Sequence, residues 1–174
     1  MNTKSILLAY ATRYGSTQEV AGAITAVLRE AGFDVDIQLM QEVQTLANYD
    51  AVVLGAAIYN AKWHPDAHQF LSQHQEALSQ RPVVIFALGP LSTSDAARRN
   101  SRRQLNSELA KYPWLEPVAV EIFAGKYDPS KPGLGFFDRF VPASDHRDWD
   151  AIRAWANALP AQLQHDEMLK PVGV

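Results

Sequence analysis

Four short, nearly uninterrupted apolar runs limit what this chain can fold into more than any other feature of its sequence. They cover residues 6–10, 51–54, 83–88 and 118–123. Each run has the length of a strand, and the lack of in/out alternation is typical of strands covered on both faces of a parallel sheet. Residues 35–39 alternate between apolar and polar side chains, which predicts an edge strand.

Amphipathic segments separate the apolar runs. Apolar side chains recur at helical spacing over residues 17–31, 65–78, 94–111 and 148–163. This alternation of strands and helices predicts an open, doubly wound α/β sheet with helices on both faces. Residues 1–164 are assigned to one domain, followed by a polar tail at 165–174. Residues 125–147 are rich in proline and glycine and predict a long loop after the last strand, where a functional element is expected.

The composition excludes several classes of function. The 174 residues are 47% hydrophobic and 20% charged, as in an ordinary globular protein. A net charge of -3 offers no basic surface to nucleic acid, so we predict no nucleic-acid partner. Because the chain has no cysteine, redox chemistry would need a bound cofactor.

The same sequence predicts a cytoplasmic protein. Its amino-terminal apolar run is too short for a signal peptide. Its longest apolar stretches also fall short of the roughly 20 residues that cross a bilayer as a helix. We therefore expect no transmembrane segment, while peripheral contact with a membrane stays open.

A turn rich in hydroxyl groups follows the first predicted strand. It reads Thr12-Arg13-Tyr14-Gly15-Ser16-Thr17. The start of a helix offers free N–H groups and the positive end of the helix dipole, to which Thr12, Ser16 and Thr17 add hydroxyl donors, so the turn suits a phosphate group. Gly15 allows a positive φ angle, and Arg13 adds charge unless its side chain points to solvent. A simpler interpretation is that Ser16 and Thr17 cap the helix.

Two further loops follow predicted strands at the edge where open α/β sheets bind ligands. Residues 55–65 combine small residues with Tyr59 and Trp63, whose rings offer surfaces for stacking. Packing of Trp63 in the domain core is an equally good interpretation. Residues 89–95 form the other loop, which has no aromatic side chain.

Histidines and arginines supply weaker candidates. His64 and His68 have the i, i+4 spacing of a metal pair, but no acidic third ligand is spaced as in zinc motifs, so we predict no metal site and favour capping or solvated histidines. A basic cluster on the third predicted helix is interpreted as a solvated face, with docking of an acidic partner or a carboxylated substrate as the alternative. Its members are Arg98, Arg99, Arg102 and Arg103.

The turn at 12–17 has the form Ser/Thr-x-Thr/Tyr-Gly-x-Thr and resembles the phosphate loop of the flavodoxin superfamily. The order of predicted elements is also similar. The resemblance implies a three-layer, flavodoxin-like sandwich with a five-stranded parallel sheet of order 2-1-3-4-5, and it implies FMN as the cofactor. The implied cofactor-binding residues are Thr12, Arg13, Tyr14, Gly15, Ser16, Thr17, Ala56, Ala57, Ile58, Tyr59, Trp63, Gly89, Pro90 and Leu91.

A narrower resemblance is to the flavodoxin-like family that includes menaquinone-dependent protoporphyrinogen dehydrogenase. It is carried by residues 55–58, 64–71, 124–125, 137–140 and 148–156. It implies an FMN-dependent oxidoreductase that passes electrons between a small planar organic substrate and a quinone-like or protein acceptor. No catalytic side chain is assigned.

Two alternatives to this function remain open. In the first alternative, the chain is a non-enzymatic FMN electron carrier that serves redox partner proteins. In the second, it is a flavodoxin-like fold that acts without flavin as an interaction module. The position of residues 125–147 discriminates between the enzyme and the carrier. Closure of this segment over the flavin would favour catalysis, and a position away from it would favour the carrier.

Overall fold

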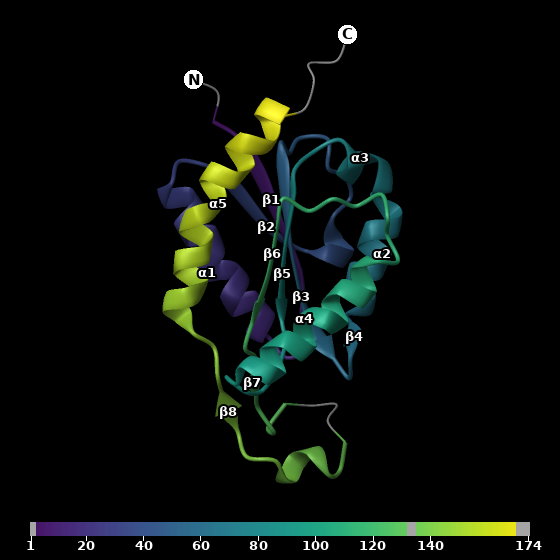
Figure 1. The fold of residues 1–174 in the computed structure, drawn as a ribbon, viewed down its shortest axis with the longest axis vertical. Helices are drawn as coiled ribbons and strands as arrows, with labels where there is room; N and C mark the ends of the chain where they lie inside the picture. The colour runs from purple at the N-terminus through teal and green to yellow at the C-terminus, as the bar shows by residue number, and fades with distance from the viewer. Residues whose placement is uncertain (1–2, 132–134, 170–174) are drawn as a thin grey trace.

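A computed structural model describes residues 3–131 and 135–169. Its centre is a parallel sheet in the order β2-β1-β3-β5-β6 (Figure 1). The strands are β1 (Ser5–Ala11), β2 (Asp34–Leu39), β3 (Ala51–Tyr59), β5 (Val83–Leu88) and β6 (Ala119–Phe123). Counted along the chain, these five strands have the 2-1-3-4-5 order, so the predicted fold class is confirmed.

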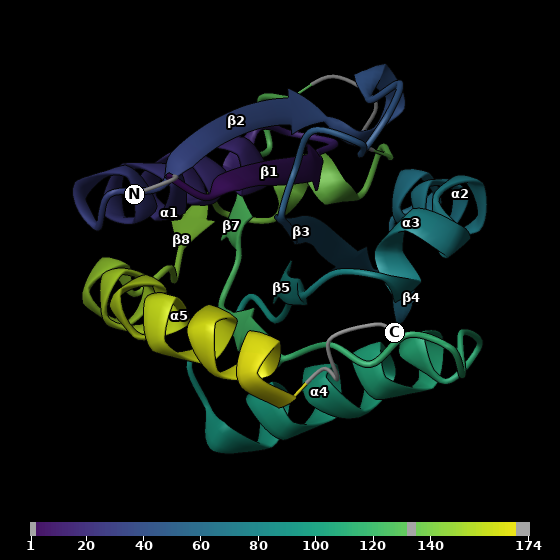
Figure 2. The same ribbon diagram turned by 90° about the horizontal axis from the view of Figure 1, so that it is seen from above.

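Helices cover both faces of the sheet (Figure 2). One face carries α1 (Ser16–Glu30) and α5 (Trp149–Leu169), and the other carries α2 (Pro65–Gln73), α3 (Gln75–Ser79) and α4 (Asp95–Leu109). The predicted helix at 65–78 is divided at His74, which has a φ of -113°. The last helix continues to Leu169, beyond the predicted limit at 163. Residues 170–174 of the predicted tail lie outside the described residues.

Two hydrophobic cores follow from this layering. Ile6 and Leu8 of β1 pack with Val20 of α1 on one face. Leu7, between them, packs with Phe70 of α2 on the other face. Since successive strand residues point to opposite faces, both must be apolar, which explains the continuous apolar runs.

The prediction of a loop from residue 55 is wrong, because β3 continues to Tyr59. Its end folds back in an antiparallel pair with β4 (Lys62–Trp63). Asn60 and Ala61, both with positive φ angles of 49° and 62°, form the connecting turn. Two positive φ angles are what a tight hairpin turn requires. Asparagine accepts this conformation readily and alanine does not, so only one of the two residues indicates a turn at this position.

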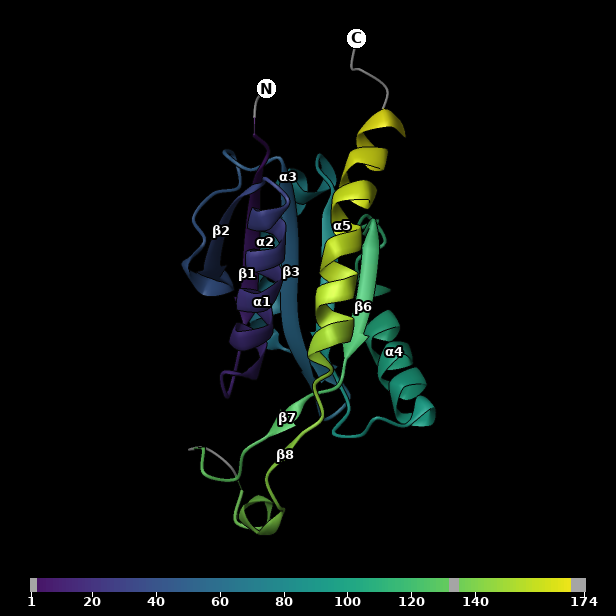
Figure 3. The ribbon, with the colours of Figure 1, turned by 90° about the vertical axis from the view of Figure 1, so that its left-hand side faces the viewer.

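The segment 125–147 also contains a hairpin. β7 (Lys126–Tyr127) pairs with β8 (Ser144–Asp145), with Lys126 opposite Asp145. A short 3-10 helix, η2 (Asp138–Phe140), lies near the tip, and a second one, η1 (Met40–Glu42), follows β2. Figure 3 shows the hairpin projecting beyond the carboxyl ends of the strands.

Among the described residues, no helix is both long and apolar enough to cross a membrane.

Candidate functional site

The turn between β1 and α1 is organised around its glycine. Gly15 is the N-cap of α1, has a φ of 90°, and no side chain caps the helix. The hydroxyl of Thr12 accepts a hydrogen bond from the Gly15 backbone N–H at 2.8 Å and thereby fixes the turn. Capping by Ser16 or Thr17 is therefore the wrong interpretation, and the first N–H groups of α1 have no partner within the helix.

Thr17 carries a polar atom with no partner in the described part of the chain. Its side chain is 1% exposed, and its Oγ1 forms no hydrogen bond. A buried hydroxyl without a partner costs about 1–3 kcal/mol, so such atoms usually have a functional explanation. A phosphate oxygen at the start of α1 would supply the missing partner.

A cavity of about 860 Å³ opens beside this turn. This is within the range of roughly 300–1,000 Å³ that is typical of small-molecule sites. Seven of the residues predicted to bind the cofactor line it: Arg13, Tyr14, Ser16, Thr17, Ala57, Tyr59 and Trp63. The rest of its wall is formed by Asn60, Lys62, His64, Pro65, His68, Glu108 and Lys111.

Arg13 joins the turn to the hairpin of β3 and β4. Its guanidinium lies 5.8 Å from the ring centroid of Tyr14 and 5.2 Å from that of Tyr59. The two rings contact each other edge to face, with 6.5 Å between centroids. Arg13 is thus placed by cation–π contacts at the cavity wall.

Trp63 is positioned as a core residue. Its side chain is 2% exposed, and its indole N–H donates to the carbonyl oxygen of Ala56 at 3.3 Å. This burial favours the core-packing interpretation over stacking on a flavin. Tyr59 is 41% exposed and offers the more accessible ring.

The third predicted loop lies apart from the large cavity. The backbone N–H of Gly89 donates to Phe123 at 2.8 Å, and the carbonyl oxygen of Pro90 accepts from Gly125 at 2.9 Å. Pro90 lines a separate cavity of about 190 Å³ near the end of β6. The assignment of Gly89, Pro90 and Leu91 to the cofactor remains a prediction, as do those of Thr12, Gly15, Ala56, Ile58 and the seven residues that line the large cavity.

A buried polar network that was not foreseen from the sequence forms the far wall of the cavity. The ring nitrogens of His68 lie 2.6 Å from Tyr112 Oη and 2.6 Å from Glu108 Oε2. Glu108 also accepts from Lys111 Nζ at 2.7 Å and from the Trp63 N–H at 3.3 Å. The network ties α2, the end of α4 and β4 together. The contacts of Trp63 and His68 with Glu108 and Tyr112 span 40 to 45 positions, so no local pattern relates the two halves of the network.

Burial alone would raise the pKa of Glu108, but the hydrogen bonds from Lys111, His68 and the Trp63 N–H outweigh it and lower the pKa. The carboxylate is therefore ionised at neutral pH. His64 behaves differently, because it caps α2 by accepting from the Asp66 N–H at 3.2 Å. Burial lowers the pKa of His64. The capping interpretation of His64 is confirmed.

We predict that Glu108→Gln destabilises the protein by about 2 kcal/mol, the value of charge-assisted hydrogen bonds. The amide keeps the shape of the side chain but loses the charge that faces Lys111 and His68. Urea denaturation at neutral pH measures the change. Because the lowered pKa means that the carboxylate stabilises the fold only when ionised, the difference between the two proteins should shrink below about pH 4. A difference that is constant down to acidic pH would contradict this account.

Arg147 is a second residue near the site whose contacts were not predicted from the sequence. Its side chain is 3% exposed, and it pairs with Asp145 through Nη2 at 2.6 Å and with Glu19 of α1 through Nη1. The guanidinium lies 4.7 Å from the ring centroid of Trp149. Arg147 therefore attaches the base of the 125–147 hairpin to the first turn of α1, next to Gly15 and Ser16.

The ion pair between Arg147 and Asp145 should persist in moderately acidic solution. The hydrogen bonds of Arg147 lower the pKa of Asp145 to about 2. A lowered pKa contributes stability that is complete above the ordinary value of about 4 and is lost as the pH falls toward 2. We predict that Asp145→Asn reduces the free energy of unfolding at pH 7 and that this reduction disappears near pH 2. Parallel denaturation curves of the two proteins across this range measure it, and an equal reduction at both ends would disprove it.

Two of the four arginines in the basic cluster on α4 form contacts within the domain. Arg98 pairs with Glu121 at 3.1 Å, and Arg102 donates to the carbonyl oxygen of Val120 at 2.9 Å. Arg99 and Arg103 are exposed. No group of three or more metal-ligating side chains is found among the described residues.

Comparison with known proteins places the chain in a family. Residues 7–142 match the model of the flavodoxin domain. The chain belongs to the flavodoxin-domain family, and this membership implies FMN as the cofactor, as the sequence predicted.

The relatives fall into two functional groups. Protoporphyrinogen IX dehydrogenase [quinone] of Escherichia coli strain K12 is 28% identical over 143 residues, which cover 78% of this chain and 75% of that protein. Oxidised flavodoxin 1 of Bacillus cereus superposes with a TM-score of 0.56 at 15% identity, covering 93% of this chain and 98% of that one. A short-chain flavodoxin associated with a bacterial microcompartment gives 0.60 at 14% identity, covering 94% and 99%. These structural matches show the fold.

Proposed function

We propose that the protein is an FMN-dependent oxidoreductase, related to protoporphyrinogen dehydrogenase, that passes electrons between a planar organic substrate and a quinone-like or protein acceptor. One observation supports an enzyme over a carrier. The cavity of about 860 Å³ extends from the turn at 12–17 past Tyr59 to the His68–Glu108 network. Its volume is near the upper end of the range for small-molecule sites, and on this proposal it admits a second aromatic molecule beside the cofactor ring.

The residues of the turn fit a flavin phosphate. The unpartnered Oγ1 of Thr17, the hydroxyl of Ser16 and the free N–H groups of α1 would hold its oxygens. Gly15 lets the backbone take the conformation that presents these groups. When bound, FMN supplies the acceptance and release of electrons.

The other predicted cofactor residues would hold the ring. Ala57 leaves room for backbone groups to approach it, and Tyr59 offers an exposed face. Gly89, Pro90 and Leu91 would meet the pyrimidine edge from the neighbouring loop. The His68–Glu108 network holds the opposite wall of the cavity in place, since it links β4 to α2 and α4.

Transient kinetics of the flavin-loaded protein test this proposal. The protein is saturated with FMN, reduced photochemically without oxygen, and mixed with increasing concentrations of menadione as a soluble quinone. We expect the rate of flavin reoxidation to reach a plateau, because the acceptor must first bind in the cavity. A rate that rises linearly without a plateau would exclude a binding site for this acceptor. Failure of the protein to bind FMN at micromolar concentration would remove the proposal altogether.

The shape of the 125–147 hairpin favours a second candidate, the electron carrier. The hairpin projects from the sheet (Figure 3). Residues near its tip have exposed apolar side chains. The described members are Phe136, Phe137, Phe140 and Val141. None of the hairpin residues that the structure describes lines the large cavity. Linear menadione kinetics combined with fast electron transfer to cytochrome c, a protein acceptor, would favour the carrier.

A further inference from the structure

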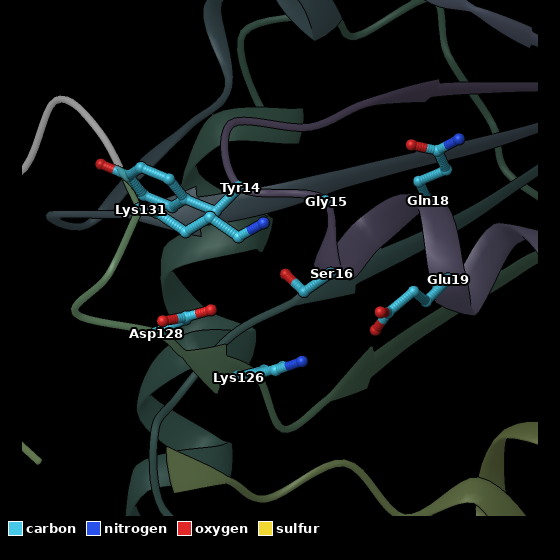
Figure 4. Close-up of a pocket in the computed structure, with 8 residues that line it drawn as sticks. All are labelled: Tyr14, Gly15, Ser16, Gln18, Glu19, Lys126, Asp128 and Lys131. Atoms are coloured by element: carbon cyan, nitrogen blue, oxygen red, sulfur yellow. The ribbon is translucent and has the colours of Figure 1, made fainter. Parts of the chain in front are cut away.

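A second cavity, of about 450 Å³, lies on the hairpin side of the turn at 12–17 (Figure 4). The turn and the start of α1 supply one wall, with Tyr14, Gly15, Ser16, Gln18 and Glu19. The hairpin supplies the other wall, with Lys126, Asp128 and Lys131. In the view of Figure 4 the amino groups of the two lysines lie on either side of Ser16.

The acidic groups of this cavity are already engaged. Asp128 Oδ1 accepts from the Ser130 N–H at 2.9 Å and from the Ser130 hydroxyl at 2.6 Å. Glu19 is bound by Arg147. By contrast, Lys126 and Lys131 form no ion pair within the described ranges. Two exposed ammonium groups therefore face the free N–H groups of α1.

Lys126 is held at this place by the base of the hairpin. Lys126 pairs in register with Asp145, and the Gly125 carbonyl oxygen accepts from the His146 N–H at 3.1 Å. Arg147 fastens this base to α1 through Glu19 and through the Ser16 carbonyl oxygen at 3.5 Å. The position of Lys126 beside the turn is thus a fixed feature of the fold, and Lys131 lies on the same wall of the cavity.

We propose that Lys126 and Lys131 bind a phosphate monoester dianion at the start of α1. The buried, unpartnered Oγ1 of Thr17 belongs to the same first turn of α1, where it borders the neighbouring large cavity, and it indicates that an anion belongs at this helix end. Together the hairpin and the turn surround the phosphate with ammonium groups, a hydroxyl and backbone N–H groups. The inference rests on the proposed function insofar as FMN is one source of the phosphate, and a different phosphorylated ligand is the other.

The double variant Lys126→Gln/Lys131→Gln tests this inference. Both side chains are exposed, so the variant should fold, which circular dichroism verifies. Flavin fluorescence measures the affinity of the apoprotein for FMN and for riboflavin, which lacks the phosphate. We expect FMN to bind roughly 5- to 20-fold more weakly, as for two solvent-exposed charge contacts, and with a smaller dependence on salt. Riboflavin affinity should not change.

The matched control is Arg99→Gln/Arg103→Gln, which removes two exposed cations from α4 and changes the net charge equally. It should leave both affinities unchanged. If the lysine variant binds FMN normally but loses thermal stabilisation by inorganic phosphate, the site belongs to another phosphorylated ligand. If both FMN affinity and the phosphate effect are intact, the inference is overturned. Should the unmodified protein bind no flavin, the proposed function fails, while the phosphate measurement still decides this inference.

Discussion

Replacing Thr17 by valine should stabilise the flavin-free protein and, at the same time, weaken FMN binding roughly 10- to 100-fold. Valine has the same shape, and it removes a hydroxyl that is 1% exposed and has no partner, so the free energy of unfolding should rise by about 1 kcal/mol. The loss of affinity corresponds to one hydrogen bond to a charged phosphate. Chemical denaturation of the apoprotein and a fluorescence titration with FMN measure the two effects.

Thr25 provides a matched control on the same helix. It is 3% exposed, its Oγ1 also lacks a partner, and it lines neither of the cavities beside the turn. Thr25→Val should therefore stabilise the apoprotein as Thr17→Val does and leave FMN affinity unaltered. Equal affinities of the two variants for FMN would show that Thr17 does not contact the phosphate.

Gly55→Ala should lower the free energy of unfolding by about 3 kcal/mol, at the upper end of what overpacking costs. A Cβ atom at Gly55 would come within 2.0 Å of the Phe86 ring, and Phe86 is fully buried on the neighbouring strand. Phe86 in turn touches Trp155 of α5 edge to face, so it has little room to move. Urea denaturation of the apoprotein measures the loss.

Gly22→Ala is the appropriate control for this substitution. Gly22 is an exposed interior residue of α1, and a Cβ there meets nothing within 4 Å. Alanine should raise the stability by roughly 0.5–1 kcal/mol through its better helix propensity. A Gly55→Ala protein as stable as the unmodified one would mean that the strand shifts to admit the methyl group, and the residues after it, Ala57 and Tyr59, would then be displaced as well.

The layered fold could be predicted because its information is local. The runs at 6–10 and 83–88 are apolar at every position, since α1 and α5 cover one face and α2, α3 and α4 the other. The extension of β3 to Tyr59 was not predicted, because Gly55 interrupts the run after Leu54 and the turn at Ala61 carries no glycine. Backbone pairing with β4 outweighed the local preference of Ala61.

The candidate site likewise contains some residues that the local sequence could predict and others that it could not. Thr12, Gly15 and Thr17 lie within one short segment, so the sequence could suggest a phosphate turn there, with helix capping as the alternative. His68 and Glu108 meet only because α2 and α4 are folded against β4, and Arg147 reaches Glu19 across 128 positions. Contacts of this kind depend on the finished fold. The burial of Trp63 likewise follows from β4, whose existence the sequence did not reveal.

The pairing of β7 with β8 has a consequence for how this protein can vary. Because Lys126 lies opposite Asp145, the chain between them leaves the domain and returns to it at one point. Its length is therefore independent of the central sheet, and doubling it costs only about 0.6 kcal/mol in closure entropy. The tip can therefore change its length or its charged residues during evolution while the structure of the domain stays the same. For the engineer, the same position admits a reporter or a foreign recognition segment.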